Sequence, residues 1–559
     1  MKNTTFLGLD IALRGLYASQ RGMATVSHNV DNTNTPGYSR QVINQKAARP
    51  MLIAGKAGML GMGSDVVSVD RVRDTYLDDK YWSEAQYYGE WSVKNTILTD
   101  MQAIYNEPSD TGFAKIISDF YDTLQQLSTN PSDPGIRNAV KEKGIIVAKY
   151  FNSVAAHFDH LQEDLNNMVY AKVAEINNLA DQIRTLNLQI YNYEIMGNTA
   201  NDLRDQRTYL VDRLSKIINC QAYEVETGLK LPNGEPEKRF VVVISGKALV
   251  DHQHVVHLKC VNREEKLNFE DLGNLYEVLW EDGNTIDVKS GELKGYLDMR
   301  DGNDGIPAAN GQGYTPNCKG IPYYQRKMNE FVQVFARTFN EGIIDKNGDG
   351  VLDDIEGHAD GYTRSSVEGD EPSGIRFFTM LDDEGEPMDS ARFIEMIYRQ
   401  AEAAGIEDDP GTDYDERLVW GYSRFLTARN FCVSWDIESD PVENIATSSV
   451  AGEAGNNLNL KSILEMRHNT YMFMEGSGED FIKTLISTMG VDGQQYSVYM
   501  GIQEGIMKQI ENRRQSVSGV SLNEEMVNLV KYQQVYAAAA KMIETYAEVL
   551  DILINRLGL

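Results

Sequence analysis

The sequence predicts a mainly α-helical protein with inserted β domains, in which the N- and C-terminal helices pair as a coiled coil. Three observations support this fold class. A heptad-like apolar pattern runs from 151 to 190, β-branched runs interrupt the helical pattern between 219 and 290, and both ends of the chain carry apolar stripes with a 3.5-residue period. A long helical hairpin domain and outer β or irregular domains complete the prediction.

The first predicted element is a helix near the N-terminus that ends at Val30. Its apolar residues recur at three- and four-residue spacing, with polar gaps at Gln20 and Ser27. The stripe consists of Phe6, Leu9, Leu13, Leu16, Met23 and Val30. Because the end of a chain is poorly ordered unless another element holds it, this stripe needs an apolar partner.

A turn and an extended segment follow in the stretch VSHNVDNTNTPGYSRQ, residues 26 to 41. Four side chains there offer the backbone local hydrogen bonds that compete with the helix: Asn29, Asp31, Asn32 and Asn34. Pro36 and Gly37 fit the two central positions of a type II turn, and Tyr38 is expected to begin an extended segment. The alternative interpretation is an ordinary loop.

The next predicted element is the helical hairpin. The heptad-like pattern of residues 151–190 breaks at Gly197-Asn198, and a second helix then carries one apolar stripe up to Ile217. A pair of long helices joined by such a short break is typical of a helical hairpin.

A small β domain is expected after the hairpin. The runs 240–250, 255–261 and 276–280 are rich in β-branched or aromatic residues and end in turns, so we expect strands there. Residues 323–344 return to a helical pattern, with one apolar face. An acidic, turn-rich segment follows, with one expected helix near 390–404.

The closing helix has the most regular pattern. Ser521 and Glu524 match a capping box at its start. Its 4-3 stripe consists of Leu522, Met526, Leu529, Gln533, Tyr536, Ala540, Ile543, Ala547, Leu550, Ile554 and Leu557. We expect this stripe to pack against the N-terminal stripe as a coiled coil. The alternative is that each terminal helix packs separately onto the middle of the protein.

These patterns divide the chain into four expected parts. They are an inner terminal coiled-coil domain (1–60 with 518–559), a helical domain (61–218, 291–344 and 441–517), an inserted β domain (219–290) and an acidic outer insertion (345–440).

Charge and composition bear on partners and location. The formal net charge is −30, which repels phosphate backbones and anionic membranes, so we expect neither nucleic-acid nor membrane partners. Asp10 and Arg14 interrupt the apolar stretch that a Sec-type signal peptide needs, so none is expected, and export with an intact N-terminus remains open. The four cysteines form no CxxC pair, which favours buried free thiols, with a disulfide as the alternative.

The acidic insertion begins with a calcium-loop pattern, DKNGDGVLDDIE. Its candidate ligands are Asp345, Asn347, Asp349, Val351 through its carbonyl, Asp353 and Glu356, and Gly350 sits where such a loop turns sharply. No clear helix leaves the loop and no second loop pairs with it. The hypothesis is a structural Ca²⁺ ion, and the alternative is a solvated Asp/Gly turn.

No catalytic motif is evident in the sequence. HExxH, GxSxG and GxxxxGK[ST] are absent, and the His-rich run HQHVVH has no suitably placed carboxylate or Cys beside it. We therefore expect a protein that is not an enzyme and that requires no cofactor, apart from the possible structural Ca²⁺.

Several motifs together resemble a known family. SHNVDNTNTPGYSRQ resembles the signature of bacterial flagellar axial proteins (rod, hook and hook-associated proteins), in which an Asn-rich turn leads into a Gly-Tyr-x-Arg segment, here Gly37, Tyr38 and Arg40. GMGSDVVSVDRVRDTYLDDKYW (61–82) resembles the extended stretch that follows. The closing helix, IATSSVAGEAGNN (445–457) and the long hairpin are similar to those of hook-associated proteins of the hook–filament junction.

The resemblance implies a structural subunit that polymerises through its terminal helices at the hook–filament junction. The implied partners are identical subunits in a ring, the hook protein, the next junction protein and a flagellar export chaperone. It also implies export through the flagellar type III system, without a cleaved signal, to the extracellular flagellum. A hook subunit, or an axial subunit whose outer insertion is an adhesin, is the alternative. The expected assembly residues are Leu13, Leu16, Met23, Asn32, Pro36, Gly37, Tyr38, Leu529, Ile543, Leu550 and Leu553.

Overall fold

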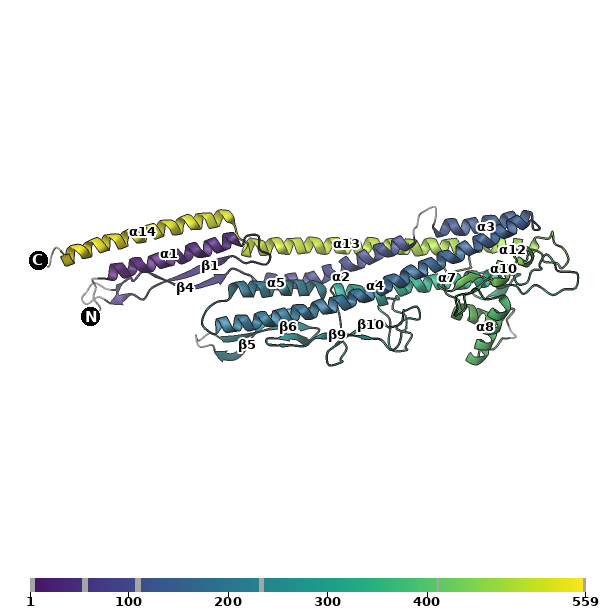
Figure 1. Ribbon diagram of the computed structural model, residues 1–559, viewed down its shortest axis with the longest axis horizontal. Helices are drawn as coiled ribbons and strands as arrows, with labels where there is room; N and C mark the ends of the chain where they lie inside the picture. The colour runs from purple at the N-terminus through teal and green to yellow at the C-terminus, as the bar shows by residue number, and fades with distance from the viewer. Residues whose placement is uncertain (1–5, 53–58, 106–111, 231–235, 410–411, 556–559) are drawn as a thin grey trace.

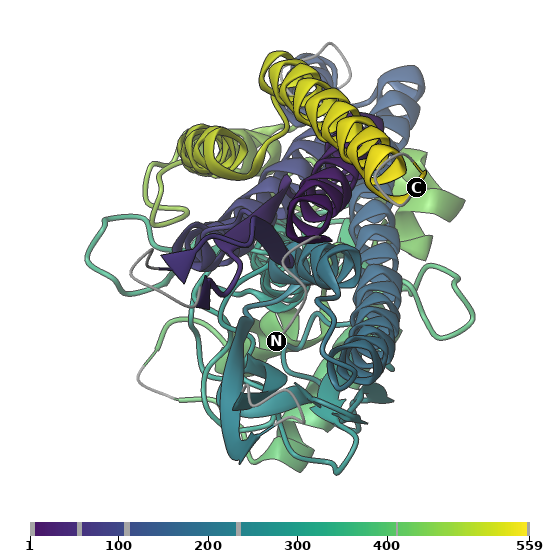
Figure 2. The same cartoon turned by 90° about the vertical axis from the view of Figure 1, so that its left-hand side faces the viewer.

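The computed structural model is an elongated rod (Figure 1). It describes residues 6–52, 59–105, 112–230, 236–409 and 412–555. The first and last helices lie together at one end of the rod, and the view along the axis shows them packed side by side (Figure 2). The chain therefore runs outward, turns back and returns to the end where it began.

In the described residues, the inner end contains two helices and two antiparallel strand pairs, β1 with β4 and β2 with β3. Strands β1 and β4 pair beneath the helices, with a bulge between Asn44 and Gln45. The bounds are α1 (Leu7–Asp31), β1 (Gln41–Ala47), β2 (Met51–Leu52), β3 (Met59–Leu60), β4 (Ser64–Arg71) and α14 (Leu522–Asn555). The chain enters the rod body after β4.

The body of the rod is a bundle of long helices, and the predicted helical hairpin is confirmed. Its first helix starts earlier than the apolar pattern, because the Asp133 side chain caps it and Pro134 occupies the first turn. The bounds are α2 (Thr75–Tyr105), α3 (Phe113–Thr129), α4 (Pro134–Glu194), α5 (Asn201–Ile217), α6 (Glu292–Asp301), α7 (Ile321–Glu341) and α13 (Gly478–Ser518).

The inserted β region is a four-stranded antiparallel sheet and a separate hairpin. The run 240–250 is two strands rather than one, because Ser245 and Gly246 form a turn with φ of 48° and 88°. Strand β5 lies at the edge of the sheet and was not predicted. The bounds are β5 (Gln221–Lys230), β6 (Pro236–Ile244), β7 (Lys247–Asp251), β8 (His254–Val255), β9 (Leu258–Asn262) and β10 (Tyr276–Trp280).

The outer end is built from short elements around α7. The helix expected near 390–404 is α8, and the aromatic side chains of this region share one core with α7, including Phe377, Phe378 and Phe431. The bounds are β11 (Ile343–Ile344), β12 (Asp353–Asp354), β13 (Phe378–Met380), α8 (Ser390–Ala404), α9 (Glu416–Phe425), β14 (Phe431–Val433), α10 (Trp435–Ser439), α11 (Pro441–Asn444) and α12 (Leu458–Met466). The acidic segment is thus joined to the helical frame by a continuous hydrophobic core.

Two hydrophobic clusters stabilise the rod, and α4 contributes to both. Its first half, from Val140 to Leu165, packs in the outer cluster, and the residues from Val169 to Ile183 pack in the cluster beneath the four-stranded sheet. No helix in the described part of the chain is long and apolar enough to cross a membrane.

The four cysteines are free in the structure. Burial is the main cause that raises the thiol pKa, to about 11 for Cys260 and to about 12 for Cys220, Cys318 and Cys432. Few thiolates therefore form at neutral pH, and these side chains behave as small apolar groups.

Candidate assembly surface

The two terminal helices pack antiparallel through a seam of small residues on α1. Three glycines of α1, spaced by seven residues, each face a side chain of α14 with the same spacing. The pairs are Gly8 with Tyr546, Gly15 with Ala539, and Gly22 with Tyr532. A Cβ atom on Gly22 would lie 2.7 Å from the Tyr532 ring. Only a residue without a side chain lets the ring lie directly on the α1 backbone.

The remaining seam positions of α1 complete a heptad pattern. Between and after the glycines, at alternating four- and three-residue spacing, lie the buried residues Ala12, Ser19, Val26 and Asn29. This spacing is that of a coiled-coil contact. The prediction that the terminal helices pair is therefore confirmed.

The expected composition of the seam was wrong, because small residues rather than the stripe of large apolar residues form the centre of the α1 contact with α14. Leu13 is 38% exposed, and Leu16 and Met23 are half-buried. Two facing stripes of large side chains would hold the two helix backbones apart, whereas glycines that face tyrosines let the backbones lie close together. On α14, Leu529, Ile543 and Leu550 are half-buried and Leu553 is 46% exposed. Their role in contacts between subunits stays a prediction.

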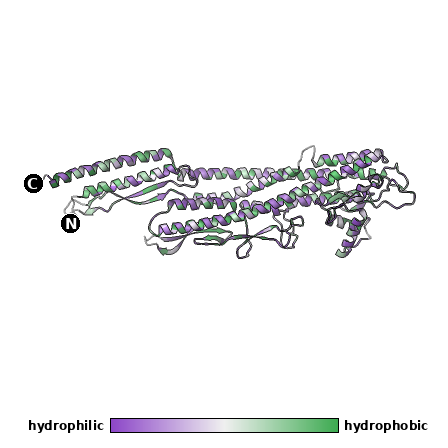
Figure 3. Cartoon of the chain, viewed as in Figure 1, coloured by the Kyte–Doolittle hydropathy of each residue, from purple (hydrophilic) through white to green (hydrophobic). Residues whose placement is uncertain are grey.

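The pair leaves much apolar surface open on α14. Figure 3 shows hydrophobic residues along this helix and α1. The exposed large apolar residues of α14 are Leu522, Met526, Val527, Val530, Val535, Tyr536, Met542, Val549, Ile552, Leu553 and Ile554. Apolar patches of such extent on a soluble protein typically mark an interaction surface.

A polar layer closes the seam where the pair meets the rod body. The Asn29 amide donates to Glu525 Oε2 at 3.2 Å and to the Gln41 carbonyl at 2.9 Å. Its Oδ1 accepts from the Gln41 N–H at 2.9 Å and from the Tyr38 hydroxyl at 2.7 Å. Burial, reinforced by nearby carboxylates including Glu525, raises the pKa of Tyr38, which keeps its hydroxyl as a donor. A hydrogen-bonded polar position in a mostly apolar seam fixes register.

The Asn-rich turn forms as the sequence predicts. Gly37 has φ of 78°, and the Tyr38 N–H donates to the Thr35 carbonyl at 3.2 Å, as in a type II turn. The helix ends at Asp31, one residue later than expected, and Asn32 caps it with φ of −100° rather than in the left-handed region. The Asn32 amide donates to the His28 carbonyl at 2.9 Å, which satisfies an otherwise unpaired helix end.

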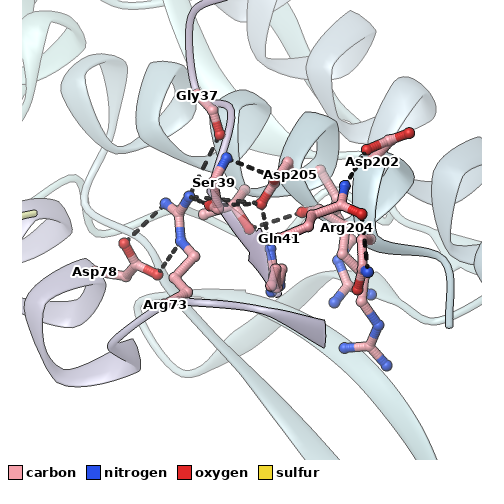
Figure 4. Close-up of polar contacts among 12 residues, drawn as sticks. Gly37, Ser39, Gln41, Arg73, Asp78, Asp202, Arg204 and Asp205 are labelled. Carbon is pink, nitrogen blue, oxygen red and sulfur yellow. Dashed lines mark hydrogen bonds and ion pairs between the residues drawn. The ribbon is translucent and has the colours of Figure 1, made fainter. Parts of the chain in front are cut away.

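The extended segment after the turn is attached to α5 through one buried carboxylate (Figure 4). Asp205 accepts hydrogen bonds from the Ser39 N–H at 2.8 Å and the Ser39 hydroxyl at 2.9 Å. Arg71 of β4 donates to the same carboxylate at 2.8 Å. The sequence pattern did not single out Asp205, because an acidic residue on an amphipathic helix normally faces solvent.

A second ionic chain connects the turn to α2 and α13. Arg73 forms a bidentate pair with Asp78, at 2.7 and 2.9 Å, and donates to the Ser39 hydroxyl at 3.0 Å (Figure 4). Arg514 of α13 contacts Asp78 at 3.0 Å and Asp212 of α5 at 2.8 Å. Bidentate arginine pairs fix orientation as well as distance. The root of the terminal pair is therefore anchored to three helices of the body.

The link between α13 and α14 is three residues long, 519–521, and Arg40, which directly precedes β1, contacts both sides of it. The Arg40 N–H donates to the Ser518 carbonyl at 2.8 Å, and its guanidinium pairs with Glu524 at 2.8 Å. The expected capping box is half present: Ser521 Oγ accepts from the Glu524 N–H at 3.5 Å, while the Glu524 carboxylate binds Arg40. The Gly-Tyr-x-Arg segment thus connects the turn to the hinge between the two helices.

In the calcium-like loop, two acidic side chains bind backbone N–H groups of the loop itself. Asp345 accepts from the backbone N–H groups of Asn347, Gly348 and Gly350 at 2.6–3.1 Å, and Asp353 accepts from the Lys346 N–H at 3.0 Å. Among the described residues, no three His, Cys, Asp or Glu side chains gather to hold an ion. Calcium binding by this loop stays a prediction.

Comparison with known proteins identifies these features. Residues 98–350 match the family model of the flagellar hook-associated protein FlgK helical domain, and residues 512–557 match that of the flagellar basal body rod FlgEFG protein C-terminal region. The flagellar hook-associated protein 1 of Bacillus subtilis is 27% identical over 99% of both chains, and that of Salmonella typhimurium is 24% identical over 98% of this chain and 99% of its own.

A solved structure shares the fold. The flagellar hook junction protein FlgK from Burkholderia pseudomallei aligns with a TM-score of 0.53 at 12% identity, over 79% of this chain and all of that chain. The paired terminal helices at one end of the rod, together with the matches to flagellar proteins, define an axial subunit of the flagellar type. Within that class, this chain belongs to the family of flagellar hook-associated protein 1.

Proposed function

We propose that this protein is a structural subunit of the bacterial flagellum that forms the junction between hook and filament by polymerising through its terminal helices. The single observation that carries the proposal is the antiparallel α1–α14 pair, which is tied to the rod at its root and leaves many large apolar side chains of α14 exposed. The family relationship supports the same function.

The physical basis of assembly is burial of that open face. Helix α1 uses a face of small residues for this pairing, so many large side chains of both helices remain exposed for contacts with neighbours. Burying the exposed half of a side chain such as Met526 or Val530 contributes about 1 kcal/mol. Isolated terminal helices are marginal in water, so we expect the pair to become fully ordered only within the polymer.

The partners follow from this function. Self-association and contact with hook and filament components are supported by the family. A ring of identical subunits, the hook protein below, the next junction protein above and a dedicated export chaperone are the finer expectations. The protein would lie in the extracellular flagellum, after export through the flagellar type III system with its N-terminus intact.

The proposal is tested by placing a charge on the assembly surface. Leu550→Asp and Leu553→Asp should leave a soluble subunit with a folded body but abolish incorporation at the hook tip, because an unpaired carboxylate in an interface costs several kcal/mol. Gln534→Asp introduces the same group at an exposed polar position of the same helix and should be tolerated. Motility and immunogold labelling of hook tips give the readout, and fully motile strains carrying both leucine substitutions would refute the proposal.

Calcium is proposed only as a structural ion of the loop 345–356. Isothermal titration of the full chain with Ca²⁺ tests it. Binding heat that is lost in Asp345→Ala would support calcium binding. The absence of heat, together with an unchanged melting temperature, would refute it.

A further inference from the structure

A groove far from the terminal helices has features that assembly does not use. It has a volume of about 760 Å³ and lies between α4, α7, α9 and the loop around Phe269. Its size is within the range of about 300–1,000 Å³ that is typical of small-molecule sites. α7 lies in the half of the rod away from α1 and α14 (Figure 1). We infer that this groove binds a neutral saccharide.

The first argument is an unpaired polar atom in the groove wall. Gln325 lines the groove and is only 7% exposed. Its amide nitrogen donates to Asp159 Oδ1 at 2.9 Å, but its Oε1 has no hydrogen-bond partner. A buried acceptor without a partner costs about 1–3 kcal/mol. Oε1 itself has almost no exposed area, so a ligand hydroxyl can donate to it only after the Gln325 side chain shifts toward the groove, and that hydrogen bond would then relieve this cost.

The second argument is the aromatic surface. Phe269 is 66% exposed, and the Arg424 guanidinium lies over its ring at 5.4 Å. Trp420 also lines the groove, with its ring edge-to-face against Phe425 at 5.4 Å. Sugar rings present C–H faces that pack on aromatic rings, while their hydroxyls bind the polar groups around them.

The third argument is the charge balance, which decides against an ionic ligand. Arg429 is paired with Asp159 at 2.5 Å. The other two guanidinium groups of the lining are matched in number by two carboxylates, and these four residues are Arg326, Arg424, Glu270 and Glu330. A ligand with a net charge gains little from such a lining, whereas neutral hydroxyls can donate to the carboxylates and accept from the guanidinium groups.

The groove also has a suitable place in the molecule. Its outer wall, α9, belongs to the acidic segment 345–440, for which a binding role was an alternative on the sequence. Saccharide binding in this groove would be a specific form of that binding role. The inference is independent of the assembly function, because none of the groove residues lies in α1 or α14.

The experiment uses the full chain and four neutral trisaccharides: maltotriose, cellotriose, chitotriose and mannotriose. Saturation-transfer NMR and tryptophan fluorescence should show saturable binding of at least one. Trp420→Ala and Gln325→Leu should each weaken binding about tenfold, the effect of one lost aromatic or hydrogen-bond contact. Ser423→Trp, at an exposed lining position, should block the groove without touching the core.

The control is Trp435→Ala, which removes an exposed tryptophan elsewhere and should leave binding unchanged. Circular dichroism and melting temperature establish that each variant is folded. Three results would overturn the inference: no binding by any of the four sugars, binding that survives both Trp420→Ala and Ser423→Trp, or tighter binding of a triglutamate peptide or a sialylated trisaccharide than of the neutral sugars.

Discussion

The register of the terminal pair can be tested with an engineered disulfide. A Cβ atom on Gly15 would lie 3.9 Å from the Cβ of Ala539, within the range of about 3.5–4.5 Å that a disulfide requires. Gly15→Cys with Ala539→Cys should therefore cross-link readily. Gly15→Cys with Ala547→Cys is the matched control, because position 547 lies about 12 Å further along the helix.

The magnitude follows from the length of chain that the bridge encloses. Residues 15 and 539 enclose a loop of about 520 residues, for which the chain-entropy model gives about 6 kcal/mol of stabilisation as an upper bound. Background oxidation should be slow, because burial raises the pKa of the native Cys260 to about 11 and that of the other three thiols to about 12.

The assay is mass spectrometry of tryptic peptides after mild oxidation at pH 8, on the free subunit and on assembled flagella. We expect the 15–539 bridge to form at least tenfold faster than the 15–547 bridge in flagella. In the free subunit both rates should be lower, because the pair is expected to become ordered on assembly. Equal rates for both bridges in assembled flagella would refute the small-residue seam.

Three further predictions test other contacts. Gly22→Ala should destabilise α14 by about 1–2 kcal/mol, measured by hydrogen exchange of assembled flagella, because overpacking against Tyr532 outweighs the gain in helix propensity. Gly505→Ala, at an open position, should instead stabilise α13 by up to about 1 kcal/mol. Stabilisation at both sites would contradict the small-residue seam. Asp205→Ala should lower the unfolding free energy, measured by denaturant titration, by about 3–5 kcal/mol, because it leaves the part-buried Arg71 without its ion-pair partner. Asp202→Ala, at a half-exposed carboxylate, should lower it by less than about 1 kcal/mol. Burial lowers the pKa of His358 to about 4, so the folded state binds fewer protons than the unfolded state between pH 6.5 and 4. The contribution of His358 to the free energy of unfolding, about 3 kcal/mol, should be complete above pH 6.5 and lost as the pH falls to 4. His358→Gln should flatten this part of the plot of unfolding free energy against pH, whereas substitution of the exposed His157 by Gln should not.

Elements with strong local periodicity were predictable from the sequence. The hairpin of α4 and α5 follows an uninterrupted apolar pattern, and the turn at Pro36 and Gly37 follows from the backbone preferences of those two residues. Strand β5 was missed because glutamates alternate through it and Gly228 interrupts it, which is the composition of a protected edge strand rather than a buried one.

The candidate site was predictable in outline but not in register. A hydropathy pattern detects large apolar residues such as Leu13 and Met23. Glycine gives no apolar signal, so the pattern did not reveal the seam around Gly15 and Gly22. The signal that could have found it is the seven-residue recurrence of Gly8, Gly15 and Gly22. The sequence motif of the calcium loop was likewise ambiguous. Asp side chains at these positions can bind an ion or accept hydrogen bonds from nearby backbone N–H groups in a turn, as Asp345 does.

Helix α4 has a mechanical consequence. Its 61 residues span about 90 Å without a break, and both hydrophobic clusters are built on it. A bending or twisting load applied at the root of the terminal pair is therefore carried along a single continuous strut to the far tip, and the two clusters cannot swivel against each other. A rotating joint built from such units would yield at the three-residue link beside Arg40 before it yielded along the shaft.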